Sequence, residues 1–440
     1  MRVLLLGIWL LLSSSGSLLA QENVRVWTGA TLLPIHQPPI ENGVLVVSGG
    51  KILSMGQSGT VQIPRGASVV DVRGKVIMPG LVDTHSHVGE VSGGDGSSAL
   101  QPDVRVLDGL NVMSPSLTRA RAGGITTVNV MPGSGHLLSG QTVYLKLRKS
   151  ANLYDLLLCK DVNHDVCGGI KLANGTNPMR DNGTFPGTRA RSAAMVRQMF
   201  IKAQAYQRKV QEAQGDAGKM PERDLQMEAL VQVLEGKRTV HFHTHRHDDI
   251  LTVIRIAQEF GFKPVLQHVS EGWRIPNEIA ASGFSTSIIV IDSPGGKLEA
   301  LHMSLETGGV LERAGVDVAL HTDDYITDSR LLLRSAALAV RGGMSRTKAL
   351  EGVTLAGARM LGMADRIGSL EAGKDADFII LSGDPLSVYT NVEETWIEGQ
   401  NVFNIRIPED RAIAKGAYGV LKGDLSHTHH DGEDAADGNH

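Results

Sequence analysis

The sequence predicts an α/β protein built on a (β/α)8 barrel, with a small β-sandwich domain assembled from both chain ends. Three observations lead to this fold class. Short apolar, strand-like runs alternate with helical patterns, several of these runs end in histidine or aspartate, and further strand-like runs lie on both flanks. Alternation of strand and helix favours a parallel sheet. Polar side chains at the C-terminal ends of many strands favour a barrel over an open sheet, which gathers its site at one switch point.

The chain begins with a segment typical of a secretory signal peptide, which we place at residues 1–20. Arg2 precedes the apolar run 3–12, and small residues then lead to Ala20 and Gln21. This run is too short to span a bilayer, and no later stretch approaches the roughly 18 apolar residues that a spanning helix requires. We therefore expect a periplasmic or secreted protein without stable membrane insertion.

The predicted β-sandwich is discontinuous in the sequence. Similar short strand-like runs occur before and after the barrel region, which indicates one domain built from two flanks. We assign residues 23–79 and 366–407 to this domain and residues 80–365 to the barrel. The runs lie at 44–47, 68–72, 378–381 and 394–397.

The first strand-like run of the barrel region ends in the pair His85 and His87. Side chains at positions i and i+2 of a strand point to the same face, so both imidazoles can bind one ion. The preceding residues 74–82 form a turn and then an apolar run, as a buried parallel strand requires. Taken alone, the pair also fits two histidines that are hydrogen-bonded in a core or loop.

A second run, at residues 239–246, alternates in the manner of a strand. It places His241, His243 and His245 on one face near its C-terminal end. His241 lies one pleat deeper than His243, so we expect it to be a core histidine rather than a ligand.

Two more apolar runs end in potential ligands. Residues 264–268 end at His268, and residues 316–324 end at Asp323 and Asp324. Adjacent strand residues point to opposite faces, so only one of the two carboxylates can reach an ion. Helical patterns separate the runs, and a longer helical pattern spans residues 188–214 as a cover for the barrel, a cap on the site or a subunit contact.

These residues carry a resemblance to a known family. The order of a His-x-His pair, a strand lysine, single histidines on two later strands and a late aspartate resembles the amidohydrolase superfamily of metal-dependent hydrolases. Several stretches are similar to its imidazolonepropionase-related branch, which includes prolidase-type peptidases. The similarity runs from about residue 24 to about residue 405. The similar stretches are 131–136 with 139–141, 169–180, 243–250 and 368–378.

The resemblance implies a set of metal ligands and a cofactor. Imidazole and carboxylate ligands suit Zn²⁺, so we expect one or two zinc ions or another divalent ion. The implied ligands are His85, His87, Lys171, His243, His268 and Asp323.

Two positions of the implied site leave alternatives open. Lys171 is either a carbamylated bridge between two ions or a structural or substrate-facing amine. Thr176 stands where related sequences commonly have an acidic residue, which removes one possible ligand.

The resemblance also implies catalytic and substrate-binding residues. Asp323 would shuttle the proton as well as bind metal, and His245 would share the catalytic work. His245, Arg246 and His136 would face a small-molecule amide or peptide substrate.

The function implied by the resemblance is that of an exported amidohydrolase. It would cleave amide-type C–N bonds by a metal-activated hydroxide, with a dipeptidase or prolidase-like activity. One alternative is a cyclic-amide, imidazolone-type hydrolase or a deaminase. An alternative of another class is a metal-free structural or binding homologue. A homo-oligomer is compatible with the sequence.

Composition and cysteine usage narrow the remaining classes. The 440 residues are 42% hydrophobic with a formal net charge of −4, so the chain lacks the basic field expected of a nucleic-acid-binding protein. Cys159 and Cys167 either pair in an oxidising compartment or remain buried thiols. The segment 423–440 is rich in histidine and aspartate, and we interpret it as a disordered, solvated tail, with metal scavenging as the alternative.

Overall fold

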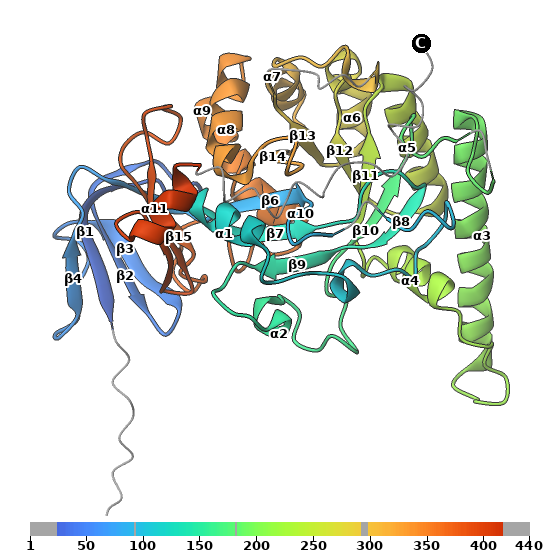
Figure 1. Cartoon of the computed structure of the whole chain (residues 1–440), viewed down its shortest axis with the longest axis horizontal. Helices are drawn as coiled ribbons and strands as arrows, with labels where there is room; N and C mark the ends of the chain where they lie inside the picture. The colour runs from blue at the N-terminus through green and yellow to red at the C-terminus, as the bar shows by residue number, and fades with distance from the viewer. Residues whose placement is uncertain (1–23, 92–93, 181–182, 292–297, 417–440) are drawn as a thin grey trace, which may run out of the picture.

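A computed structural model describes residues 24–91, 94–180, 183–291 and 298–416 (Figure 1). A β-rich region formed by both ends of the described chain lies beside a larger α/β region. The predicted signal peptide at 1–20 and the tail at 423–440 lie outside the described residues. Within the described ranges, no helix combines the length and apolarity needed to cross a membrane.

Both chain ends contribute strands to one eight-stranded sheet. Its order is β17-β16-β15-β5-β1-β2-β3, and β4 also pairs with β1. Pro79 of β5 is opposite Phe378 of β15, and this antiparallel pair joins the two flanks. The strands are β1 (Arg25–Leu32), β2 (Ile40–Ser48), β3 (Lys51–Gln57), β4 (Ser68–Asp71), β5 (Val76–Pro79), β15 (Phe378–Leu381), β16 (Val392–Ile397) and β17 (Gln400–Asn404).

This sheet curls around its own aromatic core. The ring of Trp27 in β1 lies 4.8 Å from that of Phe378 and 5.0 Å from that of Trp396 in β16. Strands β1 and β16 are three ladder steps apart, which would be about 14 Å in a flat sheet. Where we expected two facing sheets, one continuous, curved sheet therefore encloses the core.

The larger region contains the predicted strand and helix alternation, and its strands form two sheets. A six-stranded sheet has the order β14-β13-β12-β11-β10-β8, and a three-stranded sheet has the order β6-β7-β9. Neighbours from β14 to β10 are parallel, as are β6 and β7. The strands are β6 (Leu81–Ser86), β7 (Ile125–Val130), β8 (Leu138–Gln141), β9 (Val143–Lys146), β10 (Ile170–Ala173), β11 (Val240–Thr244), β12 (Pro264–His268), β13 (Thr286–Ile289) and β14 (Val318–His321).

The prediction of a parallel sheet was wrong at two strands, β8 and β9. Strand β9 pairs antiparallel with β7, and β8 pairs antiparallel with β10. Only residues 131–137 connect β7 to β8, which is too short for the crossover of a dozen or more residues that a parallel neighbour needs. Thr142 alone separates β8 from β9. The chain therefore passes at Thr142 from the six-stranded sheet, which contains β8, to the three-stranded sheet, which contains β9.

The two sheets meet again at the opposite edge. An isolated parallel bridge between Ser86 and Asp324 links the end of β6 to the chain after β14. Within the described ranges the strands form a barrel-like arrangement of two sheets instead of a single closed sheet. The ends of β6, β11, β12 and β14 are nevertheless brought together.

Helices pack around these strands (Figure 1). They are α1 (Pro115–Ala122), α2 (Leu153–Leu156), α3 (Arg189–Ala213), α4 (Leu225–Leu234), α5 (His247–Phe260), α6 (Pro276–Ser282), α7 (Thr307–Arg313), α8 (Leu332–Arg341), α9 (Arg346–Gly352), α10 (Leu355–Met360) and α11 (Pro408–Ala414). Short 3₁₀ turns are η1 (Val106–Asp108), η2 (Gly272–Arg274), η3 (Leu298–Ala300) and η4 (Ser329–Leu331).

The long helix α3 lies where the pattern over 188–214 predicted a helix. Thr188 caps its first turn by accepting a hydrogen bond from the Arg191 N–H, and Gln214 ends it in the left-handed conformation. Phe200 on its buried face stacks on Phe260 at 5.2 Å and on Phe262 at 4.9 Å. The helix therefore packs against α5 and covers the barrel-like region.

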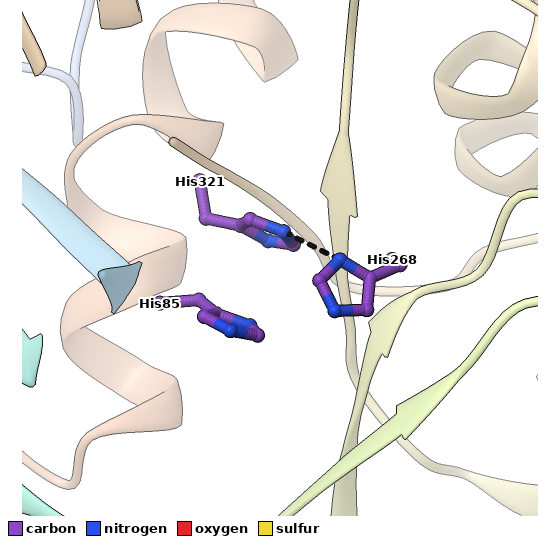
Figure 2. A group of neighbouring side chains, drawn as sticks. All are labelled: His85, His268 and His321. Carbon is purple, nitrogen blue, oxygen red and sulfur yellow. Dashed lines mark hydrogen bonds between the residues drawn. The ribbon is translucent and has the colours of Figure 1, made fainter. Parts of the chain in front are cut away.

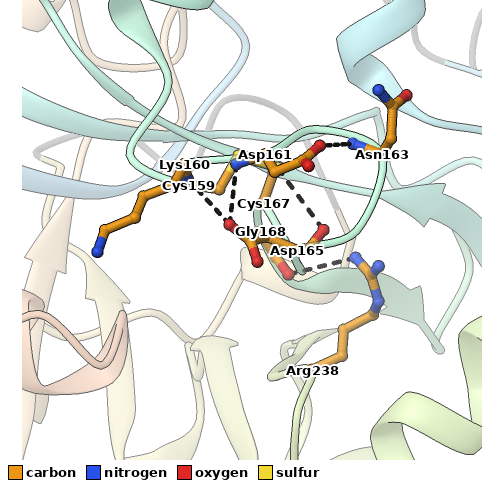
Figure 3. Close-up of a disulfide and its surroundings, with 8 residues drawn as sticks. All are labelled: Cys159, Lys160, Asp161, Asn163, Asp165, Cys167, Gly168 and Arg238. Atoms are coloured by element: carbon orange, nitrogen blue, oxygen red, sulfur yellow. Dashed lines mark hydrogen bonds between the residues drawn. A yellow bond between two sulfur atoms is a disulfide. The ribbon is translucent and has the colours of Figure 1, made fainter.

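The two cysteines form a disulfide (Figure 3). Cys159 and Cys167 close a small loop in which the backbone N–H groups of Lys160 and Asp161 donate to the Asp165 carboxylate. Arg238 donates to the carbonyl oxygen of Gly168 at 3.2 Å, just after the loop. The disulfide thus lies directly before β10, the strand that carries Lys171.

Candidate metal centre

The end of β6 supplies two imidazoles that are each oriented through the same ring nitrogen, Nδ1. His87 Nδ1 lies 2.7 Å from the carbonyl oxygen of Met131. A carbonyl oxygen only accepts hydrogen bonds, so Nδ1 donates, and in the neutral ring Nε2 then carries the lone pair that can bind a metal. His85 Nδ1 lies 3.2 Å from Oε1 of Gln267, whose amide nitrogen faces His241 at 3.1 Å. Both rings are therefore oriented by a hydrogen bond at Nδ1 and present Nε2, as metal-binding histidines do.

Asp323 faces these two imidazoles. Its Oδ1 lies 3.0 Å from His87 Nε2 and 3.3 Å from His85 Nε2, and its Oδ2 lies 3.9 Å from His268 Nδ1. Asp324 instead accepts a hydrogen bond from Arg119 at 2.7 Å and others from Ser329. Of the two neighbouring carboxylates, the structure thus brings Asp323 to the histidines.

The ends of β11, β12 and β14 add four more imidazoles to the same place. The ring of His268 lies 4.5 Å from that of His243, and it stacks nearly parallel on that of His245 at 4.7 Å. His321 Nε2 lies 3.1 Å from His268 Nδ1. Figure 2 shows His85, His268 and His321 converging from three different strands.

Three overlapping groups of donor atoms result, and within each group the atoms lie no more than 4.8 Å apart. His85 and His268 each belong to two groups, so the cluster has more donors than one tetrahedral ion requires. The groups are His85, His268 and His321, then His243, His245 and His268, and then His85, His87 and Asp323.

The protonation of these side chains fits a cation. Burial lowers the pKa of His85 and of His268 well below the ordinary value, and it lowers the pKa of His321 to about 3. These imidazoles are therefore neutral at physiological pH, which is the form that binds a metal. Burial opposes ionisation of Asp323, but positive charge on the histidine side of the carboxylate outweighs burial and holds its pKa well below the ordinary value. With the imidazoles neutral, a bound cation would supply that charge. Neutral imidazoles around a carboxylate are a suitable donor set for Zn²⁺.

Backbone conformation is unusual at two strand ends of the candidate centre. His268 has a φ of 68°, Val269 a φ of 50° and Asp323 a φ of 51°. Residues other than glycine rarely adopt this left-handed region, and each instance costs on the order of 1–3 kcal/mol. Such strain is concentrated at functional sites, and here it falls on two of the residues in the donor groups.

Lys171 lies inside the cluster. It is fully buried in β10, and its Nζ is 2.9 Å from His85 Nε2 and 3.1 Å from the Met131 sulfur. This position suits either a bridging role or a structural amine, so the bridging role stays a prediction.

The residues predicted to face a substrate are in different surroundings. His245 belongs to a donor group, and its Nδ1 lies 2.7 Å from the Ser270 hydroxyl. Arg246 forms an ion pair with Asp248 at 2.9 Å at the start of α5. His136 is buried, with its ring 5.4 Å from that of Phe185. Neither Arg246 nor His136 belongs to a donor group, and their substrate roles stay predictions.

His241 is a core histidine in the structure. Its Nε2 lies 3.0 Å from the Tyr144 hydroxyl, and its Nδ1 lies 3.1 Å from the Gln267 amide. Burial lowers the pKa of His241 to about 3. It thereby fixes Gln267, which in turn orients His85.

The sequence analysis missed His321 as a candidate ligand. It lies two residues before Asp323, so the spacing rule that identified His85 and His87 would have found it. It also missed Asp83, which accepts hydrogen bonds from the hydroxyl and the N–H of Thr322 and braces the chain beside Asp323. Burial raises the pKa of Asp83 to about 7.

Comparisons with known proteins agree with this geometry. Residues 76–402 match the model of the amidohydrolase family. The chain is 26% identical over 425 residues to the amidohydrolase tasK of Hapsidospora irregularis, covering 87% of this chain but 43% of that protein. It is 25% identical over 409 residues to an imidazolonepropionase of Mesorhizobium japonicum, covering 82% and 92%.

A solved structure gives the strongest of these likenesses in fold. The crystal structure of an amidohydrolase from Thermotoga maritima matches with a TM-score of 0.80 at 35% identity, covering 86% of this chain and 99% of that one. The strand-end histidines, the matched family model and this likeness lead to the same conclusion. The chain belongs to the amidohydrolase family and is a hydrolase that acts on C–N bonds.

Proposed function

We propose that this protein is an exported, metal-dependent hydrolase that cleaves amide-type C–N bonds in small substrates, with a dipeptidase or prolidase-like activity. The observation that carries the proposal is the convergence of six histidines and Asp323 from four strand ends into one buried cluster. A pure scaffold would have no need for this donor set, so the cluster argues against a metal-free structural or binding role.

Some of the proposed site residues would hold the metal, and others orient the residues that hold it. His85, His87, His243 and His268 would hold one or two divalent ions, with Zn²⁺ as the favoured metal. When bound, such an ion polarises a carbonyl and lowers the pKa of a water molecule. Met131 and Gln267 keep two of the rings in the orientation that presents Nε2.

Asp323 is the proposed proton carrier. Its carboxylate would be ionised beside a bound cation, and an ionised carboxylate can accept a proton from the attacking water. It would then pass that proton to the leaving nitrogen. His245, oriented by Ser270, is placed to contact the substrate next to His268.

Two observations support export. The first is the apolar segment with small residues that precedes Gln21. The second is the disulfide between Cys159 and Cys167, since disulfides persist mainly in oxidising compartments. A periplasmic or secreted location is therefore part of the proposal.

A cyclic-amide hydrolase is the second candidate. It is favoured by the relative named imidazolonepropionase, whose length is matched over 92%. A lactam and a dipeptide present the same type of bond to the ligand cluster, so the residues around the cluster would decide between them.

A substrate screen tests the proposal. The zinc-loaded mature protein would be offered dipeptides with C-terminal proline, N-acylated amino acids, lactams and an imidazolone, with the Asp323→Asn variant as control. We expect hydrolysis of one of these classes by the wild type only. Turnover of none of them by a protein that binds zinc would contradict the proposed activity.

A further inference from the structure

A buried carboxylate lies beside the metal centre but belongs to none of the three donor groups. Glu299, in the turn η3, is 3% exposed. Its Oε1 accepts a hydrogen bond from the Thr176 N–H and lies 3.8 Å from Arg189 Nη2. Among the described residues its Oε2 has no hydrogen-bond partner, and it lies 3.9 Å from His243 Nε2.

The arginine nearby does not account for the second oxygen. Arg189 Nε makes its closest contacts with Asp249, at 3.0 and 3.1 Å. Its Nη2 lies 3.8 Å from Glu299 Oε1, which is beyond hydrogen-bond distance. A buried carboxylate oxygen without a partner is costly, since it has lost its hydration and gained nothing in exchange. A cation on the His243 side of the carboxylate would remove that cost.

The separation of the two atoms suits shared coordination. Two ligands of one tetrahedral zinc, each at ~2.0–2.2 Å, lie about 3.4 Å apart. The observed 3.9 Å between Oε2 and His243 Nε2 is close to that value. Gly175 makes room for the carboxylate, because a Cβ at this position would collide with it.

We propose that Glu299 is an additional metal ligand, on the His243 side of the centre. The donor group of His243, His245 and His268 contains imidazoles only, and Glu299 would supply it with a carboxylate. It would thereby compensate for Thr176, which provides no carboxylate ligand. This inference rests on the proposed function, because it requires that the centre binds an ion.

Zinc affinity measured by competition with a chromophoric chelator tests this role. Glu299→Gln removes the charge and keeps the size of the side chain. Asp249→Asn is the matched control, because Asp249 is also buried and contacts the same arginine, yet it belongs to no donor group. We expect Glu299→Gln to weaken zinc affinity by at least about 10-fold, and where two ions bind, to do so at one of the two sites. Asp249→Asn should leave the affinity within about 2-fold.

Two further readouts do not depend on activity. The rise in melting temperature on adding zinc should shrink in Glu299→Gln. With cobalt in place of zinc, the visible absorption of the bound ion should change in Glu299→Gln and not in Asp249→Asn. Glu299→Asp, which keeps the charge on a shorter side chain, should be intermediate and serves if Glu299→Gln does not fold.

The outcomes are distinguishable. Wild-type zinc affinity in folded Glu299→Gln or Glu299→Asp overturns the role of Glu299. An equal loss in Asp249→Asn also overturns it, because the effect then comes from the brace around Arg189. A wild type that binds no zinc contradicts the proposed function itself, and with it this inference.

Discussion

Two buried groups of titratable side chains differ in one respect, which is whether the chain itself supplies their counter-charges. The first surrounds Lys146 in β9, whose Nζ contacts the carboxylates of Asp375, Asp377 and Glu398. The second is the metal centre at the strand ends. Lys146 is as deeply buried as His85, so burial alone does not separate the two groups.

The Lys146 group is balanced within the protein. Lys51 at 2.5 Å and Arg366 at 3.0 Å also pair with Asp375, and Arg148 at 2.7 Å pairs with Glu398. It ties the barrel-like region to the curved sheet, because Asp375 and Glu398 flank strands of that sheet.

The metal centre gathers imidazoles around one carboxylate, and burial lowers the pKa of three of them, those of His85, His268 and His321. The Lys146 group therefore needs no further charge, because the chain supplies both its cations and its anions. The metal centre offers donor atoms, and the proposed metal ion would supply the positive charge.

The largest expected effect is on the chemistry of the centre. Asp323→Asn should lower kcat/KM by about 10²–10⁴-fold, because the proposed proton carrier is lost. Initial rates on the substrate found by the screen measure this. Asp324→Asn is the control within the same dipeptide, and it should keep bound zinc because Asp324 pairs with Arg119. Unchanged turnover in Asp323→Asn would remove Asp323 from the mechanism.

A comparable effect, on stability instead of activity, is expected at the other group. Lys146→Met leaves buried carboxylates without their shared ammonium, which should cost about 3–5 kcal/mol in the free energy of unfolding. Urea unfolding measures the loss, and zinc content should stay at the wild-type value in the folded variant. If zinc content falls with stability, the two groups are not independent.

Removal of the metal should have a smaller effect on stability. Zinc at 100 times its dissociation constant stabilises the folded state by about 2.7 kcal/mol. Chelation should therefore lower the unfolding free energy of the wild type and of Lys146→Met by the same amount. If chelation changes the unfolding free energy of neither protein, the centre does not bind a stabilising ion, and the contrast between the two groups is contradicted.

The smallest expected effect is in the response to acid. Burial opposes ionisation of Asp375, but its bond with Lys146 lowers its pKa to about 2, and Arg148 and Lys146 lower that of Glu398 to about 2. Both values lie below the ordinary ones, so the unfolded chain binds more protons in this range. This stabilisation is present above pH ~5 and is lost as pH falls toward ~2. Unfolding curves between pH 5 and 3 should be steeper in pH for the wild type than for Lys146→Met, and equal slopes would contradict the assignment.

Sequence patterns predicted the arrangement of side chains where the spacing of nearby residues determines it. The spacing of His85 and His87 on a strand predicted that their side chains lie together at the strand end, and the alternation at 239–246 placed His243 and His245 on one face. The same rule covers His321 and Asp323, so the omission of His321 was an error of application. The connection of 131–137 was likewise short enough to predict an antiparallel return.

Other features have no local signal. Asp375 and Glu398 lie 229 and 252 residues from Lys146 in the sequence, and only the folded chain pairs them. Glu299 comes from a short turn rather than a strand end, so no periodicity marks it. Its position near His243 depends on contacts with separate segments of the chain, those that carry Thr176 and Arg189.

Metal content of the mature protein, counted by inductively coupled plasma mass spectrometry, tests the central claim most directly. The protein would be purified without an affinity tag, with bicarbonate present, and with His427, His429, His430 and His440 replaced by asparagine so that only the centre is counted. We predict at least one zinc ion per chain. Two ions that fall to one in Lys171→Ala would indicate a bridging lysine. A folded chain that retains no ion after incubation with zinc would contradict the account.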